Sequence, residues 1–243
     1  MSPAVSAILL DAAGVLFFPQ PDFMLEQLKT AGLAPEPGVL DQAHFRAMAV
    51  QDMAGRASRT GGWWPGYLEA YFAACGVPEA DCPALAEQAA AATTRGMWTY
   101  IRPGTIEGLR ALAGLGLPMG VVSNADGRLQ AALARLGLVH VPGSELEAGI
   151  PVGVVLDSTR AGVAKPDPAI FLLALETLGV PPGPSVRHVG DSLRSDVDGA
   201  QAAGLQPVHF DPYGTCPAPA GHAHTRSLAG LAATISQQAA TAQ

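Results

Sequence analysis

Charged residues are scarce in this chain, and lysines are the scarcest of them. Only 14% of the 243 residues are charged, and the two lysines are Lys29 and Lys165. The net charge is -7, whereas a nucleic-acid surface needs clustered Lys and Arg, so we expect no nucleic-acid partner. At 49% hydrophobic residues, the composition also excludes a disordered protein. A single lysine in a motif therefore carries more information here than in an ordinary sequence.

The chain also lacks a long apolar run and a paired-cysteine pattern. No uninterrupted apolar span approaches the roughly 20 residues that cross a bilayer, and the start has no basic region followed by an apolar stretch. The three cysteines, Cys75, Cys82 and Cys216, lack the tight paired spacing of a zinc site, so we take them as ordinary small residues in a reducing compartment. We expect a cytoplasmic protein, monomeric or homodimeric, with no membrane partner.

The apolar runs predict an α/β protein with an inserted helical block. Residues 4–10, 119–122, 152–156, 187–189 and 207–210 are typical of buried strands, and helical segments at 105–115, 127–136, 169–178, 196–203 and 227–240 alternate with them. Residues 23–31, 40–54, 64–75 and 83–100 show helical segments broken by Pro and Gly, without a convincing strand. We predict a discontinuous α/β core domain, residues 1–16 and 103–243, with a Rossmann-like parallel sheet flanked by helices, and an all-helical cap domain at residues 17–102.

Polar side chains stand at the ends of the predicted strands or in the loops beyond them. In an open α/β sheet, ligands bind outside the carboxyl ends of the strands, so these residues are the candidate site. A carboxylate nucleophile, a hydroxyl, an ammonium and a pair of metal-binding carboxylates suit phosphoryl transfer through an aspartyl-phosphate. The candidates are Asp11, Ser123, Asn124, Lys165, Asp191 and Asp196.

Each candidate has an expected role. Asp11 is the nucleophile, and with Asp191 and Asp196 it supplies the oxygen ligands that Mg²⁺ prefers. Ser123 and Lys165 hold the transferring phosphoryl group, and the ammonium keeps the nucleophile ionised. Asn124, beside the serine, positions backbone or substrate.

In this order and spacing, the motifs resemble those of the haloacid dehalogenase superfamily. The family pattern is an Asp-x-Asp-Gly motif, a Ser or Thr after the second strand, a Lys, and a Gly-Asp pair with a further Asp behind it. This chain has Asp11-Ala12-Ala13-Gly14, Ser123, Lys165 and Gly190-Asp191 with Asp196. The likeness runs from about residue 4 to the late 230s, and it implies a hydrolase with a helical cap after the first motif. It also implies that the backbone carbonyl of Ala13 is a further Mg²⁺ ligand. Gly14 has a reason of its own, because a sharp turn after Asp11 with the backbone close to a ligand needs positive φ or no Cβ.

Ala13 departs from the family pattern, which has a second aspartate there to protonate the leaving oxygen and then activate water. Such acid-base help is worth about 10²- to 10⁴-fold. Three explanations stay open: an engineered substitution that weakens turnover, a natural variant acting on a leaving group that needs little protonation, such as an acyl phosphate, or other chemistry. We expect a Mg²⁺-dependent phosphatase acting on a small phosphorylated metabolite through Asp11, and the alternative is a catalytically weak phosphate-binding protein.

Two other chemistries of the superfamily also tolerate the missing aspartate. Phosphonate cleavage needs a cap lysine for a Schiff base, and Lys29 is the only candidate, while dehalogenation needs no metal and generally lacks the Gly190-Asp191 pair. Among the histidines outside the cap, His188 is interpreted as structural, and His222 and His224 are assigned to a loop without acidic partners for a metal. The cap residues that could face substrate are His44, Arg46, Arg56, Arg59, Trp63 and Trp64.

Overall fold

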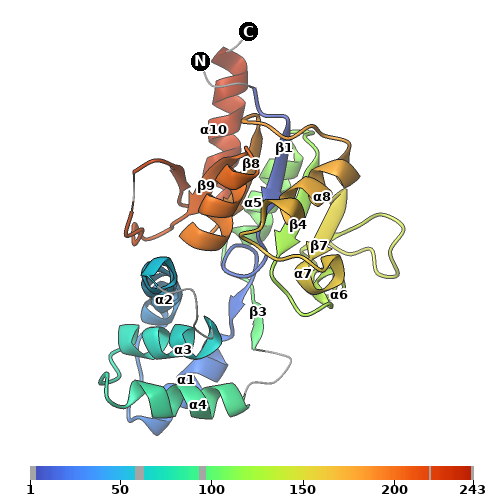
Figure 1. Cartoon of the computed structure of the whole chain (residues 1–243). Helices are drawn as coiled ribbons and strands as arrows, with labels where there is room; N and C mark the ends of the chain where they lie inside the picture. The colour runs from blue at the N-terminus through green and yellow to red at the C-terminus, as the bar shows by residue number, and fades with distance from the viewer. Residues whose placement is uncertain (1–3, 58–62, 93–96, 219, 242–243) are drawn as a thin grey trace. The chain divides into compact units, whose positions relative to one another are not determined.

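The computed structural model describes residues 4–57, 63–92, 97–218 and 220–241 and divides the chain into two compact units (Figure 1). The core unit comprises Met1–Leu16, Arg102–Pro212 and Ala220–Gln243. The helical unit comprises Phe17–Ile101 and Tyr213–Pro219. The segment 213–219 thus groups with the helical unit, although the sequence pattern assigned it to the core domain.

A six-stranded sheet forms the centre of the core unit. Every neighbouring pair is parallel, and the strand order is β10-β9-β8-β1-β4-β7. The five predicted strands are present, but β10 was missed because it is only three residues long and two of them are exposed. The strands are β1 Ala7–Leu10, β4 Met119–Ser123, β7 Val154–Asp157, β8 Val186–Gly190, β9 Gln206–Phe210 and β10 Ala223–Thr225.

Helices lie on both faces of this sheet (Figure 1). Ala7 and Leu9 of β1 point to one face and join Phe171 and Leu175 of α8 in a buried cluster, where each large side chain contributes about 1.5–3 kcal/mol. α5 and α10 pack together elsewhere on the unit, and Gly108 permits this because a Cβ there would come within 2.6 Å of Leu228 Cβ. The helices are α5 Thr105–Ala113, α6 Leu129–Arg135, α7 Ser158–Ala161, α8 Pro168–Leu178, α9 Gly199–Ala202 and α10 Leu228–Thr241.

The segment after β8 is helical earlier than the sequence pattern predicts. A π-helical stretch, η1, spans Leu193–Asp198 and runs into α9, whereas we expected a helix from residue 196 to 203. The Ser192 side chain caps η1 by accepting a hydrogen bond from the Ser195 N–H at 3.1 Å. Asp196 therefore lies inside the helix rather than at its cap, and its carboxylate is available for other contacts.

The helical unit contains α1 Pro21–Thr30, α2 Pro37–Ala57, α3 Trp63–Ala74 and α4 Cys82–Ala92. Its interior is formed by large side chains that include Tyr67, Leu68, Tyr71 and Phe72. The helix expected over residues 83–100 ends at Ala92, and β3 Trp98–Tyr100 instead pairs antiparallel with β2 Phe18–Pro19. In the core unit, a short parallel pair joins β5 Val139–His140 to β6 Ile150–Pro151.

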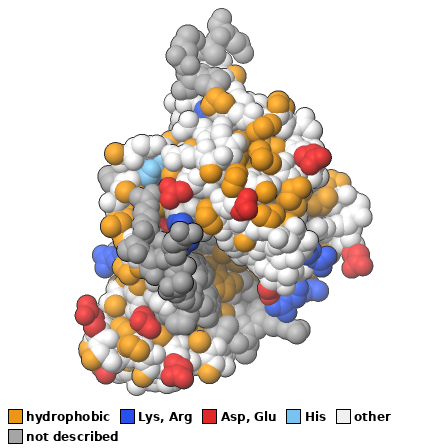
Figure 2. Space-filling view, viewed as in Figure 1, with side chains coloured by type: hydrophobic (Ala, Val, Ile, Leu, Met, Phe, Trp, Pro, Cys, Tyr) orange, Lys and Arg blue, Asp and Glu red, His pale blue; other side chains and the backbone are white. Residues whose placement is uncertain are grey.

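Among the described residues, no helix combines the length and the apolar character needed to cross a bilayer. On the face seen in Figure 2, uncharged atoms cover most of the surface, and Lys and Arg side chains form no continuous band. This distribution agrees with the low charge content of the sequence.

Candidate active site

Asp11 leaves the carboxyl end of β1 with its backbone and side chain both held. Its N–H donates to the Val189 carbonyl of β8 at 2.8 Å, and its Oδ1 accepts a hydrogen bond from the Ala12 N–H at 2.7 Å. Because β1 lies between β8 and β4, the ends of these three strands meet at one edge of the sheet. The residues predicted after separate strands are thereby brought together.

Lys165 is the centre of the site. Its side chain is only 1% exposed, and Nζ lies 2.9 Å from Asp11 Oδ2 and 2.6 Å from Asp196 Oδ1. A buried ammonium is stable only when it is paired, and two carboxylates provide that pairing here. The second of the chain's two lysines, Lys29, is exposed on α1. The cation is therefore built into the acidic cluster and is not a surface charge.

Asn124 positions the backbone of Lys165. The Asn124 side chain donates from Nδ2 to the Lys165 carbonyl at 3.0 Å and accepts at Oδ1 from the Lys165 N–H at 2.8 Å. This two-point contact joins the end of β4 to the loop before α8, across 41 positions of sequence. Asn124 thus acts on the loop that carries the lysine.

The Asp196 carboxylate accepts three hydrogen bonds from the protein. Oδ1 accepts from Lys165 Nζ and lies 2.8 Å from His188 Nε2, and Oδ2 accepts from the Ser192 N–H at 3.1 Å. These contacts compete with the expected role of Asp196 as a direct metal ligand and make it the group that holds the lysine. His188 is fully buried on β8. The sequence did not predict its contact with Asp196, because the alternation of residues along a strand shows only that this side chain points inward.

Two glycines give the carboxylates room. Gly14 has φ +81, and a Cβ there would come within 2.1 Å of Asp191 Oδ2, as the expected sharp turn requires. A Cβ on Gly190 would come within 2.0 Å of Asp196 Cγ. An alanine at either position would therefore force a neighbouring group to shift.

Burial and charge pull the pKa values of the cluster in different directions. Burial raises the pKa of Asp11, and the nearby Asp196 adds to this, while Lys165 and a hydrogen bond from Ser123 lower it; the net pKa is raised. Burial also opposes ionisation of Asp196, but Lys165 and His188 outweigh it and hold the pKa of that carboxyl well below its usual value. Burial lowers the pKa of Lys165, yet the two carboxylates raise it overall, so the lysine is an ammonium at neutral pH.

The donor set fits a divalent cation. The oxygens of Asp11, Asp191 and Asp196 lie within 4.8 Å of one another, and all three residues are buried. Three buried carboxyl groups gather around the single Lys165 ammonium, so acidic groups outnumber the cation. Hard Mg²⁺ prefers carboxylate and carbonyl oxygens, so the chemistry and charge of this cluster both suit it.

Ala13, where the family pattern has a second aspartate, presents a half-buried methyl group two residues after Asp11. Of the cap candidates, His44 is buried in the helical unit with Nδ1 2.9 Å from the Tyr67 hydroxyl, and Arg46 is exposed and contacts Gln42. Their placement favours packing and solvent over substrate contact. Arg59 and the side chains of Arg56, Trp63 and Trp64 lie outside the described residues.

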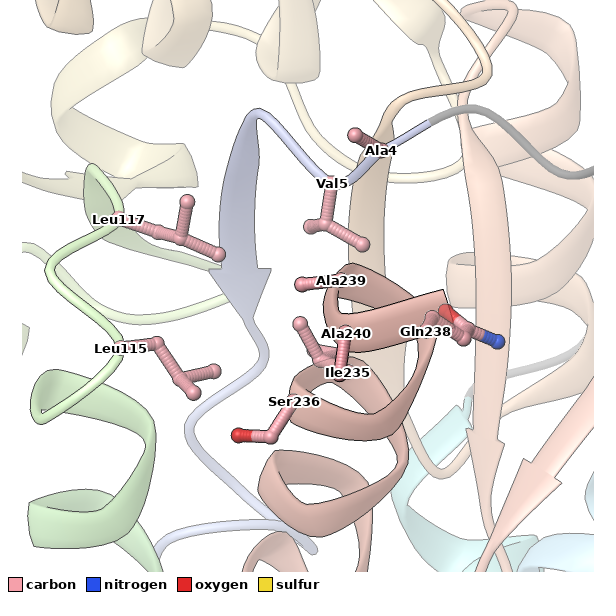
Figure 3. Close-up of a pocket in the computed structure, with 9 residues that line it drawn as sticks. All are labelled: Ala4, Val5, Leu115, Leu117, Ile235, Ser236, Gln238, Ala239 and Ala240. Carbon is pink, nitrogen blue, oxygen red and sulfur yellow. The ribbon is translucent and has the colours of Figure 1, made fainter. Parts of the chain in front are cut away.

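A pocket of about 400 Å³ opens elsewhere on the core unit, between the segment before β1 and α10 (Figure 3). Val5, Leu117 and Ile235 point into it, and Ser236 and Gln238 supply polar atoms at its rim. The nine described residues that line it include no titratable side chain. The pocket lies at the amino end of β1, whereas Asp11 follows the carboxyl end of that strand, so the pocket is not the candidate active site.

Comparison with known proteins agrees with this geometry. A family model described as haloacid dehalogenase-like hydrolase matches residues 5–204. The protein named haloacid dehalogenase-like hydrolase domain-containing protein 3 is 35% identical in Danio rerio, over 59% of this chain and 55% of that protein. In Xenopus laevis it is 31% identical over 76% of this chain and 75% of that protein.

More distant similarities extend the comparison. Ribulose-1,5-bisphosphate 5-phosphatase of Halopiger xanaduensis is 35% identical over 45% of this chain and 42% of that protein. The structure of the putative hydrolase YfnB from Bacillus subtilis, solved with bound magnesium, superposes with a TM-score of 0.62 at 17% identity, covering 96% of this chain and 99% of that one. Fold, motifs and family match agree: the chain is a member of the haloacid dehalogenase-like hydrolases, a family with phosphatases among its relatives.

Proposed function

We propose that this protein is a Mg²⁺-dependent phosphatase that hydrolyses a small phosphorylated metabolite through an aspartyl-phosphate on Asp11. The observation that carries the proposal is the buried Lys165 ammonium between Asp11 and Asp196, within a group of three carboxylates at the carboxyl edge of a parallel sheet. An anionic phosphoryl group needs a fixed cation beside the attacking carboxylate, and this arrangement supplies one.

In the first step, Asp11 attacks phosphorus and its carboxylate oxygen forms a new P–O bond as the bond to the leaving oxygen breaks. Ser123 and Lys165 hold the phosphoryl oxygens, which gain charge in the transition state. In the second step, water attacks phosphorus and forms a new P–O bond as the P–O bond to Asp11 breaks. Asp11 leaves as a carboxylate, the water proton passes to a phosphate oxygen or to solvent, and phosphate is released. Splitting one displacement into two in this way is the advantage of covalent catalysis.

Mg²⁺ is the cofactor that the donor set favours. We assign it to Asp11, Asp191 and the Ala13 backbone carbonyl, with the charge of Asp196 close by. A bound Mg²⁺ would neutralise charge on the phosphoryl oxygens and help to orient them. Asp191 belongs to the same buried cluster as the nucleophile, which supports a shared ion.

Ala13 restricts which leaving groups the site can release. Its methyl group cannot protonate the leaving oxygen or deprotonate water, so an alkyl phosphate lacks acid-base help worth about 10²- to 10⁴-fold. An acyl phosphate leaves as a carboxylate and needs no proton. We therefore favour substrates with such stable leaving groups. The same substitution supports the second candidate function, a protein that binds phosphate ligands and turns them over weakly.

The test is phosphate release from acetyl phosphate and from an alkyl phosphate, with Mg²⁺ or with EDTA. We expect this chain to cleave acetyl phosphate only with Mg²⁺, and Ala13→Asp to gain at least about 10²-fold on the alkyl ester. Asp11→Asn is the matched control and should be inactive on both. Activity in EDTA, or in the Asp11→Asn variant, contradicts the proposal, and Mg²⁺-dependent phosphate binding without turnover by either protein favours the second candidate.

The other chemistries of the superfamily have less support. Schiff-base cleavage of a phosphonate requires a lysine sheltered enough to react as the free amine, and Lys29 is exposed on α1. Dehalogenation is metal-independent, so release of halide from a 2-haloacid in EDTA would identify it and exclude the phosphatase proposal.

A further inference from the structure

Three of the six histidines gather at one edge of the core sheet. His209 lies in β9, His224 is its register partner in the edge strand β10, and His222 precedes β10 by one residue. Their ring centroids are 5.5 Å apart for His209–His222, 5.4 Å for His209–His224 and 4.5 Å for His222–His224. One ligand atom from each lies within 4.8 Å of the others. The sequence pattern predicts a loop for His222 and His224, but β10 places His224 on the sheet.

His209 has the protonation pattern of a metal ligand. Its side chain is buried, and Nε2 lies 3.1 Å from the Asp191 carbonyl, which can only accept a hydrogen bond. Nε2 therefore carries the proton, and Nδ1 retains its lone pair. Within the described residues Nδ1 has no hydrogen-bond partner. Leaving such a buried group unsatisfied is unfavourable, whereas a cation would use the lone pair. A backbone carbonyl on the other nitrogen is the usual outer contact of a metal-binding histidine.

The neighbouring rings are arranged to share that cation. Alternate residues of an extended segment point to the same side, so His222 and His224 project together from the start of β10. A metal ion binds the neutral form of an imidazole ring. Like charges at these separations would repel, so three neutral rings around one cation are the better arrangement.

We propose that His209, His222 and His224 bind a Zn²⁺ ion at a site separate from the acidic cluster. Imidazole nitrogens suit zinc, copper and nickel, while Mg²⁺ prefers oxygen, so the two sites select different metals. Zinc in proteins is tetrahedral and takes a fourth ligand. Cys216 precedes His222 by six residues in the connection between β9 and β10, and a chain of that length reaches about 20 Å. Its thiolate is the fourth ligand that we test.

Zinc at this position would fasten the edge of the sheet. β10 has only three residues, and its one strand neighbour is β9, so the ion would add a second connection between them. His209 also contacts the backbone of Asp191, which connects the histidine cluster to the strand end that carries the acidic site. Zn²⁺ should therefore slow hydrogen exchange in β9 and β10 first.

The test is a Zn²⁺ titration of tag-free protein by calorimetry, with excess Mg²⁺ present to occupy the acidic site. We expect one Zn²⁺ per chain. The His222→Ala/His224→Ala double variant should bind Zn²⁺ more than about 100-fold more weakly, which is a larger loss than the removal of an outer contact of a metal site causes. His140→Ala is the matched control, because His140 is half-buried in β5 and also has an unpartnered Nδ1. This control should bind Zn²⁺ like the natural sequence.

Three results would overturn the site: no zinc binding by the natural sequence, equal binding by the double variant, or binding that disappears in Asp191→Asn but not in the histidine variant. Should the double variant fail to fold by circular dichroism, His224→Ala alone replaces it, since that side chain is exposed. Co²⁺ tests the fourth ligand: a thiolate-to-cobalt absorption band that Cys216→Ser removes identifies Cys216, and an unchanged spectrum assigns that position to another ligand.

Discussion

Replacing Lys165 by methionine tests the charge balance of the acidic cluster. Methionine has nearly the same length and fills the same buried space, so the change removes the ammonium with little loss of packing. Asp11 and Asp196 then lose the cation that lies 2.9 Å and 2.6 Å from their oxygens. Breaking a buried ion pair by removing one partner costs about 3–5 kcal/mol. We expect a loss of that size in the free energy of unfolding of the core unit at pH 7.5 in EDTA.

The loss should depend on pH and on metal. Without the ammonium, the raised pKa of Asp11 rises further and the lowered pKa of Asp196 moves up as well, so protonation as pH falls relieves the repulsion and restores stability to the variant. In the natural protein, the depressed pKa of Asp196 contributes stability above its unfolded pKa, and this is lost only as pH falls below that value. The difference between the two proteins should therefore shrink between pH 7.5 and pH 5, and also on adding Mg²⁺.

The chain allows the two units to be followed separately. All three tryptophans, Trp63, Trp64 and Trp98, belong to the helical unit, so tryptophan fluorescence reports on that unit. Hydrogen exchange of β1 and β8 during urea unfolding reports on the core unit. Lys29→Met is the matched control, exposed on α1, and should change stability by less than about 0.5 kcal/mol. A core loss below about 1 kcal/mol, or one that neither pH nor Mg²⁺ alters, refutes this account of the site.

Two further substitutions test the positioning of the cluster. Gly190→Ala would place a Cβ 2.0 Å from Asp196 Cγ, so it should lower the free energy of unfolding by about 1–3 kcal/mol and remove most of the acetyl phosphate hydrolysis. Gly183→Ala is the control, because a Cβ there would have nothing within 4 Å. Similar losses in both variants would contradict the steric argument. Asn124→Ala removes both hydrogen bonds to the Lys165 backbone. Urea unfolding should therefore show about 1–3 kcal/mol of destabilisation, and steady-state kinetics should show a raised KM. Unchanged values would show that the loop carrying Lys165 keeps its position without Asn124.

The strands that end at Asp11 and Asp191 were predictable because their signals are local. A short apolar run closed by a polar residue and glycine marks a buried strand, and the ends of parallel strands share one edge of the sheet. The same reasoning predicted the turn at Gly14, whose φ is +81. Helix boundaries were less accurate: the segment 98–100 became a strand because β2 offered it a partner.

The sequence alone thus determined the fold class, the family and the residues of the acidic cluster, since each depends on motifs of a few neighbouring positions. Tertiary structure decided the contacts between distant segments. His188 reaches Asp196 because η1 begins early enough to turn that carboxylate back toward β8. His209 meets His224 because β10 pairs with β9 in one register, and a three-residue edge strand carries too little pattern of its own to predict that pairing.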